Sequence, residues 1–145
     1  MSVEENKALI QRFVGEAFNR GNLDVVDEIY APGYVGHTAG FPGQTPGPEG
    51  VKEFIELYRS AFPDLHTTIE DIVAEGHTVA YRWTAVGTHQ GELLGIPPSS
   101  NHVELTGITI ERIEDGKIVE TYNNFDQLGM MRQIGAIPAP EQSEG

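Results

Sequence analysis

Apolar residues in the first half of the chain recur every three or four positions, the spacing of a helix that buries one face. The first such stretch places apolar side chains at Leu9, Ile10, Phe13, Ala17 and Phe18. Ser2 and Glu5 stand before it in the pattern of a capping box. We therefore expect a helix over residues 3–19, a short second helix over residues 23–29 and a third that begins at Pro48.

Beyond residue 64 apolar and polar residues alternate, which is typical of strands. This alternation runs through residues 65–73, 78–87, 103–113 and 118–125, and a last helical turn follows at residues 128–134. Helices followed by hairpin-linked strands predict an α+β fold. We expect a cone-shaped α+β barrel, in which the N-terminal helices pack on a curled, mainly antiparallel sheet and enclose a pocket.

Residues 30–48, between the second and third helices, contain four prolines and five glycines. This composition predicts a long loop, and long ordered loops often form pocket walls or lids. We expect Tyr34 to contact the substrate and His37 to lie near the mouth of the pocket. The other interpretation of His37 is an ordinary exposed loop histidine.

The composition is that of one globular domain, which we place at residues 1–137, with a polar tail at residues 138–145. Nine basic against 22 acidic side chains give a net charge of −13, which repels phosphate backbones and argues against a nucleic-acid partner. No apolar run approaches the ~18 residues of a membrane span. The N-terminus does not have the pattern of a signal peptide, so we expect a cytoplasmic protein without membrane contact. The absence of cysteine excludes disulfides, thiolate metal sites and cysteine nucleophiles.

The last predicted strand carries several groups able to handle protons. Strict alternation would place on one face Ile118, Glu120, Tyr122, Asn124 and Asp126. We expect this face to line the pocket with proton-handling groups, where Tyr122 and Asn124 are placed to hold a substrate oxygen. The alternative for Asp126 is a cap of the short helix that follows it.

Three further residues are candidates for substrate binding. Trp83 lies in the middle of a predicted strand, as a core residue or a pocket wall, while His89 and His102 lie at strand ends. The histidines show neither an HxH nor an HExxH spacing, so we expect no metal. Nucleotide, flavin, phosphate-loop and GxSxG patterns are also missing from the sequence, which favours cofactor-free acid–base chemistry.

A series of loose motifs occurs in a specific order along the chain. They are Phe62-Pro63-Asp64-Leu65, Glu75-Gly76-His77-Thr78-Val79, residues 83–92, Gly95-Ile96-Pro97-Pro98, residues 112–120, Asp126-Gln127-Leu128-Gly129 and Gln133-Ile134-Gly135. In this order the chain resembles the SnoaL-like polyketide cyclases, or ester cyclases, of the nuclear transport factor two-like superfamily. The chain departs from the family pattern at Tyr122, where relatives often have tryptophan, and at Ser99-Ser100, where they often have Thr-Gly.

The resemblance implies a cofactor-free enzyme that acts on a small, largely apolar carbonyl substrate by intramolecular aldol ring closure. It maps the catalytic acid/base onto Asp126 and an accompanying loop histidine onto His37. It also implies a homodimer through the outer face of the sheet, which we expect to carry Val119 and Phe125. Two alternatives stay open: an epoxide-opening hydrolase with an Asp–Arg–Asp relay on the same fold, and a protein that binds a small molecule without catalysis.

Overall fold

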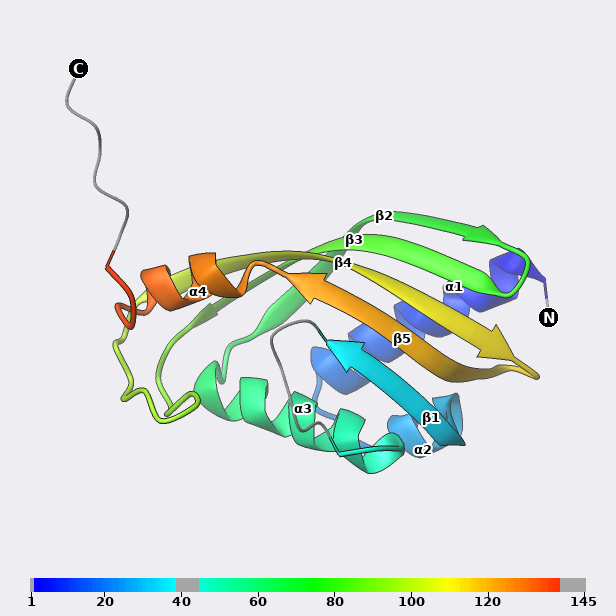
Figure 1. Ribbon diagram of the computed structural model, residues 1–145, viewed down its shortest axis with the longest axis horizontal. Coiled ribbons are helices and arrows are strands. Elements are labelled where there is room, and N and C mark those ends of the chain that lie inside the picture. The colour runs from blue at the N-terminus through cyan, green and yellow to red at the C-terminus, as the bar shows by residue number, and fades with distance from the viewer. Residues whose placement is uncertain (1, 39–44, 139–145) are drawn as a thin grey trace, which may run out of the picture.

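The computed structural model describes residues 2–38 and 45–138, and these residues build one mixed five-stranded sheet. In the order in which they pair, its strands are β1 (Tyr30–Thr38), β5 (Lys117–Phe125), β4 (His102–Glu114), β3 (Thr78–Thr88) and β2 (His66–Glu75). β1 runs parallel to β5, and the other neighbours are antiparallel. The sheet curls without closing on itself, with β1 and β2 at its edges (Figure 1). The α+β class predicted from the sequence is confirmed.

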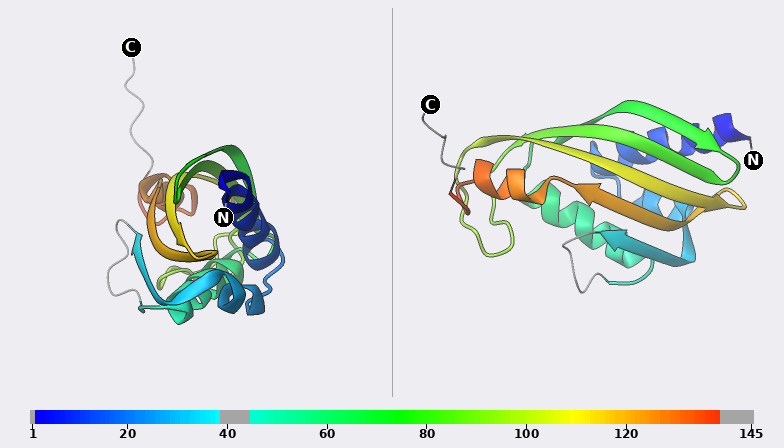
Figure 2. Two further views of the ribbon diagram at one scale, coloured as in Figure 1. Left: turned by 90° about the vertical axis from the view of Figure 1, so that its right-hand side faces the viewer. Right: turned by 45° about the horizontal axis from the view of Figure 1, so that its top comes forward.

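Helices cover the concave side of this sheet. They are α1 (Val3–Arg12), the π-helical segment η1 (Phe13–Phe18) that continues it, α2 (Asp24–Ile29) and α3 (Pro48–Ala61). Figure 2 shows the sheet curling around one side of the molecule while α1 and α3 close the other. A last helix, α4 (Gln127–Gln133), packs against β4 beyond the end of β5. None of the helices found in residues 2–38 and 45–138 has the length and apolar content needed to span a bilayer.

The helix and hairpin ends follow the local signals of the sequence. The Glu5 amide donates to Ser2 Oγ at 3.1 Å and the Ser2 amide to Glu5 Oε1 at 3.2 Å, so the predicted capping box is confirmed. Between β4 and β5, Asp115 and Gly116 both have positive φ angles, of 50° and 75°. This is the backbone conformation that a tight hairpin between twisted strands requires.

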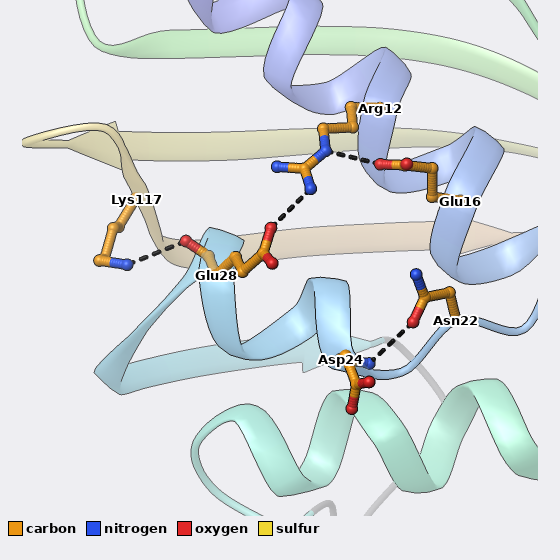
Figure 3. Close-up of polar contacts among 6 residues, drawn as sticks. All are labelled: Arg12, Glu16, Asn22, Asp24, Glu28 and Lys117. Atoms are coloured by element: carbon orange, nitrogen blue, oxygen red, sulfur yellow. Dashed lines mark hydrogen bonds and ion pairs between the residues drawn. The ribbon is translucent and has the colours of Figure 1, made fainter.

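Exposed polar contacts join α1, α2 and the start of β5 (Figure 3). Arg12 donates to Glu16 Oε2 at 2.6 Å and to the carboxylate of Glu28, whose backbone carbonyl accepts from Lys117 Nζ at 2.9 Å. At the start of α2, Asn22 Oδ1 accepts from the Asp24 amide at 3.3 Å. Solvent screens these contacts, so the packing of the apolar core holds the helices on the sheet.

The core consists of two clusters of buried side chains. The cluster under α1, η1 and α2 includes Ile10, Phe13, Val26, Ile29, Val79, Ile113 and Ile118. The cluster toward α4 includes Phe62, Leu65, Leu93, Val103, Met130 and Ile134. Trp83 and Phe18 pack against both clusters, at the place where they meet. Burying one such side chain contributes about 1.5–3 kcal/mol, so these clusters dominate the stability of the fold.

The prediction of a loop over residues 30–48 is wrong for its first half, which forms β1. Pro32 and the glycines favour a loop, but Pro32 lies on an edge strand, where a residue without an N–H is tolerated. Pairing of this strand is also irregular, because its register with β5 shifts between Tyr30 and Val35. Residues 39–44 of the expected lid, and the predicted tail from residue 139 onward, lie outside the described residues.

The predicted faces of β5 are also wrong, because a β-bulge reverses them. On β4, the consecutive residues Arg112 and Ile113 pair with Glu120 and Ile118, so that Val119 is an extra residue. The strict alternation assumed from the sequence is therefore interrupted at Val119, and the residues after it face the side opposite to the one that Ile118 predicts. Thr121, Asn123 and Phe125 face the helices, whereas Tyr122 and Asn124 are exposed on the outer face.

Candidate active site

A cavity lies between the concave face of the sheet and the helices η1 and α3. Its walls are mainly apolar and aromatic, with polar groups gathered on the central strands. The lining residues are Phe13, Val14, Phe18, Tyr30, Tyr34, Thr38, Val51, Phe54, Tyr58, Leu65, Thr67, Tyr81, Trp83, Ala85, Leu105, Thr109, Glu111, Thr121, Asn123 and Phe125. An apolar pocket with a few convergent polar groups is the usual form of a small-molecule site.

Glu111 is the one carboxylate among the described residues that line this cavity. It lies on β4 and is only 1% exposed. Its Oε1 accepts from the Tyr81 hydroxyl at 3.2 Å, and its Oε2 accepts from the Thr121 hydroxyl. Burial raises the pKa of Glu111 to about 7, although the two hydrogen bonds act in the opposite direction. The group is therefore divided between its acid and base forms near neutral pH.

Tyrosines surround this carboxylate. Burial, reinforced by the charge of Glu111, raises the pKa values of Tyr30, Tyr34 and Tyr81 above the usual value for a phenol. Their hydroxyls therefore stay protonated at neutral pH. Across the cavity on α3, the buried Tyr58 hydroxyl has no hydrogen-bond partner among the described residues. Burial raises the pKa of Tyr58 to about 12, so this hydroxyl stays protonated at neutral pH.

A second set of polar contacts crosses the cavity floor. Trp83 Nε1 donates to Thr109 Oγ1 at 2.9 Å, and Thr109 Oγ1 lies 2.9 Å from Asn123 Oδ1. These side chains come from β3, β4 and β5, the three central strands. Together with Glu111 they give the apolar cavity a polar floor built on paired strands rather than on loops.

The structure brings together only part of the predicted site. Tyr34 and Trp83 line the cavity, and their contact with a substrate stays a prediction. Six predicted residues lie outside its lining, namely Asp126, His37, His89, His102, Tyr122 and Asn124.

Asp126 lies at the N-terminus of α4. Its side chain is the N-cap and accepts from the Gly129 amide at 2.8 Å. The residue is exposed, and its carboxylate is bonded along the helix rather than directed at Glu111 or Asn123. The geometry thus favours the capping alternative over the acid/base assignment.

His37 and Tyr122 lie side by side on the outer face of the sheet. They are register partners of β1 and β5, and their rings stack with centroids 4.6 Å apart. His37 Nε2 lies 3.1 Å from Glu120 Oε2, to which the Tyr122 hydroxyl also donates at 3.2 Å. The expected place of His37 at the pocket mouth is therefore wrong, because its strand turns this side chain to the opposite face. Asn124 is exposed on the same face as Tyr122.

His89 and His102 belong to the end of the sheet near α4. His89 is fully buried, and its Nδ1 accepts from the Ser99 amide at 3.1 Å, which fixes the segment between β3 and β4. His102 is exposed at the start of β4, opposite Thr88. His89 is therefore a structural residue, and His102 is a surface residue.

Sequence reasoning missed Glu111, Thr109, Thr121 and Asn123. The signal that could have found Glu111 is its place in the alternation of residues 103–113. It shares a face with Val103, Leu105 and Ile113, which are buried. A carboxylate in such a set has to be desolvated, and that is a mark of a functional group.

Comparison with known proteins gives the family. The family model for SnoaL-like polyketide cyclase matches residues 8–134. The chain is 31% identical over 121 residues to nogalonic acid methyl ester cyclase of Streptomyces nogalater, covering 82% of this chain and 90% of the relative. It is 32% identical over 141 residues to aklanonic acid methyl ester cyclase DnrD of Streptomyces peucetius, covering 92% and 93%.

The solved structure of TsrD from Streptomyces laurentii superposes with a TM-score of 0.85 at 31% identity, covering 94% of this chain and 99% of that one. The curled sheet, its helices and the cavity thus define an α+β cone of the cyclase type. The chain belongs to the SnoaL-like polyketide cyclase family.

Proposed function

We propose that this protein is a cofactor-free acid/base enzyme that closes a ring in a small, largely apolar carbonyl substrate, with Glu111 as its base. The observation that carries the proposal is the buried carboxyl of Glu111 in the aromatic cavity, with its pKa raised to about 7. The names of the relatives, nogalonic and aklanonic acid methyl ester cyclases, support the same class of reaction.

The chemistry needs one group that takes a proton and returns it. The Glu111 carboxylate removes a proton from a carbon next to a carbonyl, and the C–H electron pair moves onto that carbonyl oxygen as an enolate. The enolate carbon then attacks a second carbonyl of the same molecule, forming the ring bond. The new alkoxide takes the proton back from Glu111, so atoms and charge balance. A pKa near the working pH lets one carboxyl serve both steps.

The cavity supports this chemistry in two further ways. Tyr81 and Thr121 hold the two carboxyl oxygens of Glu111, which fixes the direction of its lone pairs. Apolar walls such as Phe13, Tyr30 and Val51 exclude water, so that a folded substrate can keep its two reacting carbons close together.

Conversion of aklanonic acid methyl ester and nogalonic acid methyl ester by the purified protein tests the proposal. Glu111→Gln keeps the shape of the side chain and should abolish turnover. Glu104→Gln is the matched control, since Glu104 lies on the same strand but is exposed outside the cavity lining. Ligand binding without turnover by the wild type would favour a non-catalytic binding protein.

The epoxide-hydrolase alternative finds no support in the cavity. Arg82 pairs with Asp71 at 2.8 Å, and Arg112 lies 3.7 Å from Glu120. All four residues lie outside the described cavity lining, so they cannot direct a water at a ligand held there.

The homodimer is part of this proposal, with a corrected interface. Phe125 faces the cavity, so it does not belong to the outer face. Exposed apolar side chains of that face include Val73, Ile108, Ile110 and Tyr122 on β2, β4 and β5, and Val35 on β1. Register pairing joins Val73, Ala80, Ile110 and Tyr122 into one row across the sheet. A row of this kind fits a second copy of the same face. The cytoplasmic location stays a prediction from the sequence.

A further inference from the structure

The floor of the cavity holds a chain of hydrogen bonds that runs from Trp83 through Thr109 to Asn123. An indole N–H can only donate, so Thr109 Oγ1 accepts from Trp83. The hydroxyl of Thr109 then directs its own hydrogen to Asn123 Oδ1, 2.9 Å away. This uses the acceptor of the Asn123 amide and leaves its two N–H donors.

The amide nitrogen Nδ2 of Asn123 keeps its two N–H donors unused. It makes no hydrogen bond with any residue in the part of the chain that the structure describes. It is also not one of the fully buried side-chain atoms that lack a partner. Because Asn123 lines the cavity, the free donors of its amide are available to a ligand bound there.

Gly107 fixes the position of the Trp83 indole, which is the first donor in this series of hydrogen bonds. It is the register partner of Trp83, and a Cβ at residue 107 would lie 2.4 Å from Trp83 Cζ2 and 2.7 Å from Cε2. The indole therefore lies across β4 where a side chain would otherwise stand, and its N–H reaches Thr109, two residues further along the same face. The orientation of the Asn123 amide thus depends on the indole of Trp83, which lies against the backbone of Gly107.

Asn123 and Glu111 are diagonal neighbours on the cavity face. Thr109 pairs with Asn123, and Glu111 pairs with Thr121. Diagonal positions of an antiparallel pair lie about 7–8 Å apart, within reach of one small ligand group. A substrate carbonyl can therefore lie with its neighbouring carbon at the Glu111 carboxylate and with its oxygen at the Asn123 amide.

We propose that Asn123 Nδ2 donates to the substrate carbonyl oxygen that becomes the enolate oxygen, with Thr109 and Trp83 as positioning residues. This inference rests on the proposed function, in which Glu111 takes the proton from the adjacent carbon. An amide donor binds an enolate more strongly than a neutral carbonyl, so its contribution falls on the rate rather than on substrate affinity.

Steady-state kinetics with aklanonic acid methyl ester tests the rate effect. Asn123→Ala should lower kcat on the order of 10²-fold with KM nearly unchanged, the usual effect of losing one such donor. Thr109→Val should lower kcat by a smaller factor, and Thr109→Ser, which keeps the hydroxyl, should restore it. Asn124→Ala is the matched control, because the neighbouring amide is exposed on the outer face. Wild-type kcat in Asn123→Ala, while Glu111→Gln is inactive, would overturn this inference and leave the proposed function standing.

Binding of 3,4-dinitrophenol gives a readout that needs no turnover. At about pH 6 its phenolate mimics an enolate while most Glu111 still holds its proton, because the pKa of Glu111 is raised to about 7. We expect Asn123→Ala to weaken phenolate binding at least ~10-fold and to leave the affinity for the uncharged probe naphthalene unchanged. Equal phenolate affinity in wild type and variant would overturn the inference. Phenolate binding that depends on Asn123, in a protein that converts neither ester, would support the donor and contradict the proposed function.

Discussion

The Asp126 carboxylate and the Gly129 amide are joined by a hydrogen bond of 2.8 Å across the first turn of α4. A Cβ at residue 129 would lie 2.1 Å from Asp126 Oδ2, so the glycine makes room for the carboxylate. The D-x-x-G pattern is therefore accounted for by helix capping, without an acid/base role for its aspartate.

Replacement of Asp126 separates these two roles. Asparagine also caps helices, so Asp126→Asn should keep both turnover and stability, whereas Asp126→Ala should lower the free energy of unfolding by about 1 kcal/mol. Denaturant unfolding and ester turnover of both variants check this. Loss of turnover in Asp126→Asn with unchanged stability would show that Asp126 takes part in the reaction.

The raised pKa of Glu111 makes stability depend on pH. The folded protein holds this proton up to about pH 7, while the unfolded chain releases it near 4.5. Below the unfolded value this contribution to stability is complete, and it is lost as the pH rises from about 4.5 to about 7. The loss is on the order of 3 kcal/mol.

Glu111→Gln removes this ionisation. The variant should lack that fall in stability and be more stable than the wild type at pH 8, measured by denaturant unfolding across the pH range. Glu104→Gln should keep the wild-type dependence, because Glu104 is exposed. Identical pH dependence in wild type and Glu111→Gln would show that the carboxyl is not desolvated.

Gly107→Ala tests the packing of Trp83. The added methyl group would overlap the indole and the Phe125 Cβ, 2.8 Å from the new atom, so we expect a loss of about 1–3 kcal/mol. Trp83 is the single tryptophan, so its fluorescence reports the displacement directly. Gly33→Ala should change neither the stability nor the fluorescence, because its Cβ would meet nothing within 4 Å. An unchanged emission spectrum in Gly107→Ala would contradict the described contact.

Ile110→Lys tests the dimer. Ile110 lies in the middle of the exposed apolar row, where a charge would be buried by a second copy. Light scattering should give about twice 15.9 kDa for the wild type and a single-chain mass for the variant. A wild-type particle of single-chain mass at micromolar concentration would rule out the dimer.

The sequence predicts the helices and four of the strands well, because their signals are local: the capping box at Ser2, Pro48 at a helix start and the turn at Asp115-Gly116. It does not predict β1, since the pairing partner that orders this proline- and glycine-containing segment lies 85 to 88 residues away in β5. Long-range pairing overrides local propensity there.

The candidate site depended on which face of β5 is buried. One extra residue, Val119, shifts every later side chain to the other face. A bulge of this kind leaves no clear mark in a single sequence. The prediction therefore placed Tyr122 and Asn124 in the pocket instead of Thr121 and Asn123. Tyr34 and Trp83 do line the cavity, while their binding of substrate stays a prediction.

The pH profile of kcat/KM for aklanonic acid methyl ester, in wild type and Glu111→Gln, tests the central claim most directly. A base must be ionised to act, so wild-type kcat/KM should rise with pH and level off above about 7, the pKa of Glu111. Glu111→Gln should be lower at least ~10²-fold across the range, with no such rise. Wild-type kcat/KM in Glu111→Gln, with the same pH profile, would contradict the assignment of Glu111 as the base.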